Sequence, residues 1–164
     1  MKRYNRLFLP ALAVVICDQL SKYAVVRSIH LHDVVPVIGG FFNLVHVRNR
    51  GMAFGIMNRS DMDFGLYILV AATIGAILLL VFWFQRLHKE EWKMALGLSL
   101  ILGGAVGNLI DRIRLKEVID FIDFYVKGYH WPAFNVADSA ITVGTIWIAV
   151  NVIFRQPPVR GTGA

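Results

Sequence analysis

The sequence predicts an all-α membrane protein with four transmembrane helices. The 164-residue chain is 57% hydrophobic and 17% charged, whereas a soluble domain is nearer half apolar and a quarter charged. Segment 64–84 is a run of 21 residues without a charge. As a helix it would span roughly 30 Å, the thickness of the hydrocarbon core of a bilayer. The four predicted spans are 7–26, 64–84, 94–112 and 136–154.

The backbone inside a bilayer must satisfy its own polar groups, so we expect these segments to be helices. A soluble bundle with buried helices is the alternative, and the uncharged run of 64–84 argues against it. Basic residues before segment 7–26 give it some likeness to a signal peptide. However, the large Ile16 precedes Cys17, and no site of small residues closes the run. We therefore expect this segment to be a retained helix.

Residues 1–155 are expected to form one domain, and the tail 156–164, rich in proline and glycine, is expected to be disordered. Four spans place both termini on one side of the membrane. Each side carries eight basic residues, but those on the terminal side lie in shorter segments. Because basic residues concentrate in short cytoplasmic segments, we expect both termini in the cytoplasm. The formal charge of +6 is explained by these flanking residues, so we expect no nucleic-acid partner.

Two long loops lie on the side opposite the termini. In the first, segment 34–47 is rich in Val, Ile and Phe around Gly39-Gly40, which predicts two short strands joined by a turn. The second loop runs to about Pro132, and the fourth helix is expected to begin around Asn135.

Ionisable and amide side chains gather at this same end of the predicted bundle. Ionisable residues inside or beside membrane spans are costly to bury and therefore indicate function. Their common location is what a single site requires. They are Asp18, Lys22, Asn49, Asn108, Asp111, Arg112, Asp120, Asn135 and Asp138.

Two carboxylates that share one proton can hydrolyse a peptide bond without a metal. Asp120 and Asp138, 18 residues apart, are the predicted pair. Asp123 could share a helix face with Asp120, and spacing alone does not choose between them. Among the motifs for metal, serine or nucleotide chemistry, HExxH, GxSxG and Walker-type loops are missing, and the histidines and the single cysteine lack ligand spacing. We expect neither metal nor cofactor.

Each of these residues also has an ordinary structural explanation. A helix N-cap with an acid in the first turn explains Asn135 and Asp138. An i,i+4 ion pair explains Asp18 and Lys22. Further ordinary explanations are a turn at 49–51, a helix end with interfacial charges at 111–112, and close helix packing at Gly103, Gly104 and Gly107.

Three other functions are compatible with acids in a membrane protein. A proton-coupled transporter would carry acids near the bilayer midplane, often in related repeats, whereas here they lie at one end and no repeat is found. A scaffold using the glycines of the third helix predicts that Asp→Asn changes at 120 and 138 are silent. A presenilin-like peptidase would have acids within adjacent spans and a GxGD motif, which is missing.

Five motifs along nearly the whole chain resemble the signal peptidase II family, the lipoprotein signal peptidases of bacterial inner membranes. They are Asp18-Gln19-x-x-Lys22, Asn49-x-Gly51-x-Ala53-Phe54, Gly103-Gly104-x-x-Gly107-Asn108-x-x-Asp111-Arg112, Val118-Ile119-Asp120-Phe121 and Pro132-Ala133-Phe134-Asn135-x-Ala137-Asp138-Ser139.

The resemblance implies four transmembrane helices with a small β-cradle and a short surface helix at the periplasmic face. Segment 34–47 would belong to the cradle, and the second loop would hold the surface helix. The implied activity is that of an aspartyl endopeptidase, which cuts a precursor just before a diacylglyceryl-modified cysteine. The implied partners are prolipoproteins and membrane lipids, and we expect a monomer. The implied catalytic pair is Asp120 and Asp138, and the matching supporting positions are Asp18, Lys22, Asn49, Gly51, Asn108, Asp111, Arg112 and Asn135.

Overall fold

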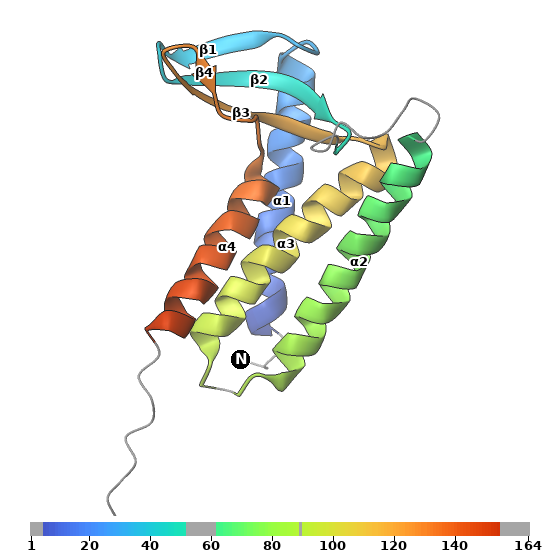
Figure 1. Cartoon of the computed structure of the whole chain (residues 1–164), viewed down its shortest axis with the longest axis vertical. Helices are drawn as coiled ribbons and strands as arrows, with labels where there is room; N and C mark the ends of the chain where they lie inside the picture. The colour runs from blue at the N-terminus through green and yellow to red at the C-terminus, as the bar shows by residue number, and fades with distance from the viewer. Residues whose placement is uncertain (1–4, 52–61, 89, 155–164) are drawn as a thin grey trace, which may run out of the picture.

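A four-helix bundle carries a small antiparallel sheet at one end in the computed structural model of the chain (Figure 1). The structure describes residues 5–51, 62–88 and 90–154. The expected disordered tail and the motif residues Ala53 and Phe54 lie outside these ranges. We call the end of the bundle that carries the sheet the sheet end, and the other, where α1 begins and α4 ends, the terminal end.

The four predicted spans are confirmed, with ends that differ by a few residues. Each helix is long and apolar enough to cross a membrane, and the protein is membrane-embedded. In Figure 1, α3 lies between α2 and α4, with α1 behind it. The helices are α1 (Asn5–Ser28), α2 (Met62–Arg86), α3 (Trp92–Leu115) and α4 (Val136–Ile153).

Glycines let α3 approach two neighbouring helices closely, as the sequence predicted. A methyl group added at Gly103 would lie 2.7 Å from the carbonyl oxygen of Ala11 on α1. One added at Gly104 would collide with the carbonyl oxygen of Ala137 on α4. Small residues at such crossings allow the backbones to make close van der Waals contact, which drives helix association in lipid.

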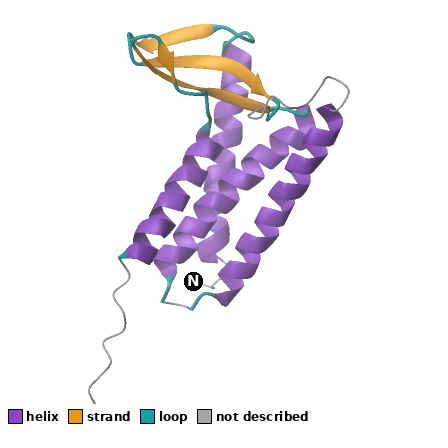
Figure 2. Cartoon of the chain, viewed as in Figure 1, coloured by secondary structure: helices purple, strands orange, loops and turns teal. Residues whose placement is uncertain are grey.

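The sheet has the order β1-β2-β3-β4, and every neighbouring pair is antiparallel (Figure 2). The two strands predicted in 34–47 are confirmed as β1 and β2, and the chain turns between them at Gly40, where φ is +78°. Glycine adopts this left-handed conformation without strain. The strands are β1 (Val34–Ile38), β2 (Phe42–Asn49), β3 (Val118–Val126) and β4 (Tyr129–His130).

The second loop does not contain the expected surface helix, and that prediction is wrong. Residues 118–126 form β3 instead, and the described residues between α3 and α4 contain no helix. Seven of these nine residues are Val, Ile, Phe or Tyr, which favour strands. Strand β3 pairs with β2 from Asn49↔Val118 to Phe42↔Phe124, with an irregularity between Leu44 and Val47.

A small apolar cluster fixes the sheet to the bundle. Val25 and Ile29, at the end of α1, pack against Phe121 of β3, with Leu44 and Val136 at the edge of the cluster. Asp120 precedes Phe121, so this packing brings it to the sheet end of the helices.

Candidate active site

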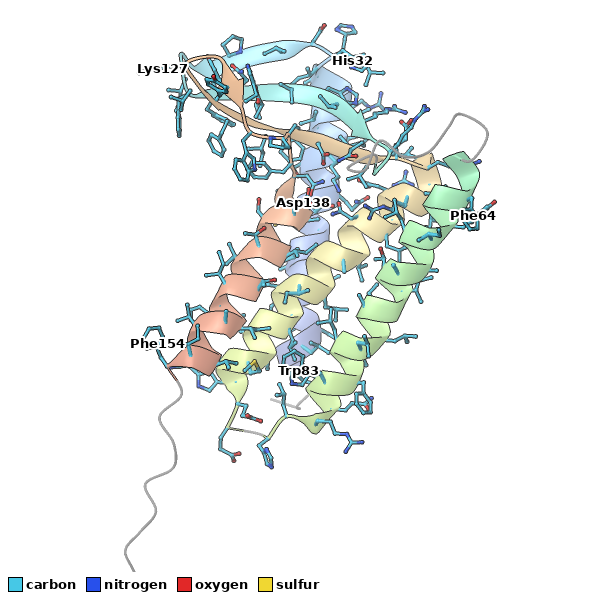
Figure 3. The ribbon with its side chains drawn as sticks, in the orientation of Figure 1. His32, Phe64, Trp83, Lys127, Asp138 and Phe154 are labelled. Carbon is cyan, nitrogen blue, oxygen red and sulfur yellow. The ribbon has the colours of Figure 1, made fainter. Side chains whose placement is uncertain are left out.

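Eight of the nine predicted polar residues meet in one hydrogen-bonded network at the sheet end. They come from α1, α3, α4 and the adjoining ends of β2 and β3. Figure 3 shows Asp138 at the start of α4, directly beneath the sheet. The sequence therefore placed these residues correctly at one end of the bundle.

A buried lysine lies between two carboxylates at the base of the network. Lys22 Nζ is 2.8 Å from Asp18 Oδ2 and 2.7 Å from Asp111 Oδ2. The Asp18–Lys22 pair was predicted from its i,i+4 spacing, whereas Asp111 comes from α3. All three side chains are at most 4% exposed. Buried charges are tolerated only when paired and hydrogen-bonded, so this cluster ties α1 to α3.

Gln19 was in a recognised motif but received no predicted role. Its amide Nε2 donates to Asp111 Oδ1 at 3.0 Å and to the Gly107 carbonyl oxygen at 3.3 Å. Asp18 meanwhile accepts the backbone N–H of Ala137 on α4 at 2.9 Å. Asp18 thus joins α1 to α4. No sequence pattern predicted the contact of Gln19 with Asp111.

The Asn108 amide links Lys22 to Asp138 by two hydrogen bonds. An ammonium group can only donate hydrogen bonds, so the oxygen of the Asn108 amide faces Lys22, at 3.1 Å. The Asn108 NH₂ group then faces Asp138 and donates to its Oδ1 at 2.7 Å. The charge on Lys22 therefore determines which atom of Asn108 reaches Asp138.

Asn135 contacts both predicted catalytic residues. Its Oδ1 accepts the backbone N–H of Asp138 at 2.9 Å, which is the predicted N-cap of α4. Because this N–H fixes the amide oxygen, the Nδ2 group faces Asp120 and donates to its Oδ1 at 2.7 Å. The capping explanation is confirmed for this residue, and the same side chain also contacts Asp120.

Asn49 is oriented by the same kind of contact. Its Oδ1 accepts the backbone N–H of Gly51 at 2.8 Å, which forms the predicted turn. Its Nδ2 donates to Asp120 Oδ2 at 3.0 Å. Gly51 has φ of +78°, where glycine is favoured, and a methyl group added there would collide with the side chain of Leu69 on α2. Gly51 therefore shapes the turn around Asn49.

Both oxygens of Asp120 accept amide hydrogen bonds, and its side chain is buried, with 2% of the residue exposed. The pKa of Asp120 is raised from 3.8 to about 6, mainly by burial and also by the nearby charge of Asp138. The hydrogen bonds from Asn49 and Asn135 and the charge of Lys22 oppose this rise. A carboxyl group with a pKa near neutral can hold or release a proton at physiological pH.

Arg112 lies outside this network. It is half-buried in the last turn of α3, and its side chain forms no hydrogen bond with the other predicted site residues. Its position at the sheet end is as predicted.

Asp123 belongs to a different part of the sheet. Residues three apart on a strand point to opposite faces, so the shared helix face considered for Asp120 and Asp123 is wrong. Asp123 accepts from Asn43 Nδ2 at 2.8 Å and lies 2.9 Å from His130 Nδ1. Among the described residues, no group of three His, Cys, Asp or Glu side chains has the arrangement of a metal site.

Comparison with known proteins decides the family. The family model for signal peptidase (SPase) II matches residues 10–154. The chain belongs to the signal peptidase II family. Its members are aspartic peptidases, so the chain is an enzyme of this class.

Relatives and solved structures agree with this membership. The lipoprotein signal peptidase of Nitratidesulfovibrio vulgaris (strain DP4) is 46% identical over 152 residues, covering 92% of this chain and 91% of the relative. That of Geobacter sulfurreducens is 43% identical and covers 95% and 97%. A solved bacterial membrane enzyme, determined by the in meso method at 1.9 Å, has a TM-score of 0.80 and 36% identity, covering 90% and 92%. Membership of a peptidase family favours the predicted peptidase over a transporter or scaffold.

Proposed function

We propose that this chain removes the signal peptide from lipoprotein precursors, with Asp120 and Asp138 as the catalytic pair. The observation that carries this assignment is the pair of fixed asparagines. Asn135 donates to Asp120 and caps the backbone of Asp138, while Asn108 donates to the Asp138 carboxylate. Two carboxylates held in this way are preorganised for acid–base work on one bond.

The proposed reaction needs one proton on the pair. The ionised carboxylate takes a proton from water as the water oxygen bonds to the scissile carbonyl carbon. The neutral carboxyl gives its proton to the carbonyl oxygen. The tetrahedral intermediate then collapses: the first carboxyl protonates the amide nitrogen, the C–N bond breaks, and the second carboxylate recovers its proton. Its raised pKa makes Asp120 our candidate for the group that is protonated at rest.

A site at one end of the bundle suits a substrate whose lipid is held in the membrane. We propose cleavage just before a cysteine that carries a diacylglyceryl group, with its acyl chains among the helices and the bond at the membrane surface. Arg112 and the asparagines would hold the substrate backbone by hydrogen bonds, which are stronger where water is excluded. Apolar burial of the lipid would supply binding energy.

We further propose that residues 1–155 act as one monomeric domain in the bacterial inner membrane, with both termini in the cytoplasm and the sheet end toward the periplasm. The density of basic residues in the short terminal-side segments supports this orientation.

The proposal is tested with purified protein in detergent and a lipid-modified precursor, with release of the signal peptide followed by gel shift. Asp120→Asn and Asp138→Asn should each lower the rate by about 10²–10⁴-fold, as expected for loss of a general acid or base. Asp33→Asn, in an exposed loop, is the matched control and should cleave at the wild-type rate.

Thermal unfolding of each variant shows whether it is folded. Folded Asp120→Asn or Asp138→Asn protein that cleaves normally would remove these residues from the mechanism. Wild-type protein that cleaves an unmodified precursor as fast as the lipid-modified one would remove the lipid requirement.

A further inference from the structure

Glu117 lies between α3 and β3, and its carboxylate contacts two arginines at the end of β2. Arg50 Nε donates to Glu117 Oε1, and a guanidinium nitrogen of Arg48 is 3.7 Å from Oε2. The Glu117 side chain is only 12% exposed, whereas those of Arg48 and Arg50 are 37% and 51% exposed. A largely buried carboxylate therefore contacts two more exposed side chains.

The two arginines flank Asn49, whose amide donates to Asp120. Asn49 is the last residue of β2 and is itself exposed, so burial does not fix its position. Beyond the irregularity after Leu44, β2 pairs with β3 through only three residue pairs, the last of which is Asn49↔Val118. Glu117 precedes Val118, so it fastens the end of this short pairing.

We propose that Glu117 is a positioning residue of the peptidase site, which keeps the Asn49 amide on Asp120 by holding Arg48 and Arg50. This inference rests on the proposed function, because it assumes that Asp120 acts in catalysis. Glu117 does not touch Asp120 and acts only through β2. Its carboxylate has a role that neither the motifs nor the predicted site included.

The inference has a consequence for proton binding at Asp120. The Asn49 hydrogen bond lowers the pKa of Asp120, because it stabilises the ionised form. Release of Asn49 therefore raises that pKa. The other charges around Asp120 are Asp138 on α4 and Lys22 on α1, with Asp18 and Asp111 bound to Lys22. Replacing Glu117 alters none of these four side chains.

The test measures kcat/KM for the lipid-modified precursor against pH. Asn49→Ala identifies the limb of the profile that belongs to Asp120. We expect Glu117→Ala to move that limb to higher pH, in the same direction, and to lower kcat about two- to fivefold, the range of a partly exposed ion pair. Glu117→Gln should give a limb and a kcat between those of wild type and Glu117→Ala, because the glutamine oxygen can still accept a hydrogen bond from Arg50. Glu90→Gln, an exposed carboxylate between α2 and α3, is the matched control and should leave the profile unchanged.

A double-variant cycle separates this role from general stabilisation. If Glu117 acts through its arginines, Glu117→Ala combined with Arg50→Ala should shift the limb no further than the larger single effect. A Glu117→Ala profile with wild-type limbs would overturn the inference, even if its melting temperature fell. If Glu117→Ala does not fold, the Glu117→Gln and Arg50→Ala profiles decide in the same way. Wild-type protein that fails to cleave would count against the proposed function instead.

Discussion

The two ends of the bundle are built from the same helices in different ways. At the terminal end, apolar residues of α1, α2 and α3 pack together, among them Leu7, Phe84 and Leu98. At the sheet end, α1, α3 and α4 are joined by charged and amide groups that are almost completely buried. Lipid provides little hydrophobic drive for helices to associate, so hydrogen bonds and close packing do more of this work. At the sheet end, the groups that hold the helices together also orient the carboxylates.

We therefore expect substitutions at the terminal end to change stability alone, and substitutions at the sheet end to change both stability and activity. A cavity at the terminal end should weaken the fold without changing the turnover of folded molecules. The loss of one polar group at the sheet end should affect both, because Lys22, Asn108 and Asp138 form a continuous chain of contacts.

The largest effect of this kind is expected from Lys22→Met. Removing the cation leaves the carboxylates of Asp18 and Asp111 buried without their partner, which destabilises by about 3–5 kcal/mol. Asn108 also loses the donor that fixes its amide, so we expect cleavage per folded molecule to fall about 10²-fold, as for a small misplacement of a catalytic group. Cleavage of the lipid-modified precursor and thermal unfolding are measured together.

Leu98→Ala is the matched change at the terminal end. Leu98 is fully buried, and its truncation should destabilise by a similar amount, about 2–5 kcal/mol. Its folded molecules should nevertheless cleave at the wild-type rate. An equal loss of cleavage per folded molecule in the two variants would show that the two ends are not separable.

The pH dependence of stability should also distinguish the ends. The pKa of Asp120 is raised from 3.8 in the unfolded chain to about 6 in the fold, so the folded state binds its proton more tightly. Its stabilising effect is complete below about pH 4 and is lost as the pH rises toward 6 and above. This difference corresponds to about 3 kcal/mol. The melting temperature of wild type should therefore fall, relative to Asp120→Asn, between pH 4 and pH 7.5.

Leu98→Ala again provides the contrast. Because it changes no titrating group, its melting temperature should differ from that of wild type by the same amount at both pH values. A wild-type curve parallel to that of Asp120→Asn would contradict the raised pKa of Asp120.

Local patterns in the sequence were sufficient for much of this molecule. The length of the apolar segments predicted the four spans, and the Val, Ile and Phe residues around Gly39-Gly40 predicted the first two strands. The Asn135 cap and the Asp18–Lys22 pair follow from spacings of three and four residues on a helix. The confinement of the polar residues to one end followed from the topology of the spans.

Contacts between distant segments could not be predicted in this way. Gln19 and Asp111 are 92 residues apart, and nothing in the sequence joins them. Strand β3 lacked the simple alternation of a half-buried strand, because Val118, Ile119, Asp120 and Phe121 are all buried. The strand β2, with which β3 pairs, is separated from it along the chain by the helices α2 and α3. The expected surface helix in this loop was wrong for that reason.

The smallest expected effect compares two helical glycines. A methyl group added at Gly104 of α3 would collide with the carbonyl oxygen of Ala137. Among the described residues, one added at Gly75 of α2 would have no atom within 4 Å beyond its chain neighbours and the backbone of its own helix. Gly104→Ala should therefore force α3 and α4 apart and destabilise by about 1–3 kcal/mol, as overpacking does. Gly75→Ala should be neutral or stabilise by up to about 1 kcal/mol, because alanine favours helices. Thermal unfolding of both variants in one detergent measures the difference.

Cleavage by Gly104→Ala and Gly75→Ala tests whether close packing of α3 and α4 also affects the site. Ala137 donates its N–H to Asp18 and lies beside Asp138, so a displaced α4 moves one catalytic carboxylate relative to Asp120. Gly104→Ala should lower cleavage per folded molecule, whereas Gly75→Ala should not. Equal cleavage would mean that the start of α4 is held by the Asn135 and Asp18 hydrogen bonds alone, and that close packing at Gly104 serves only the fold.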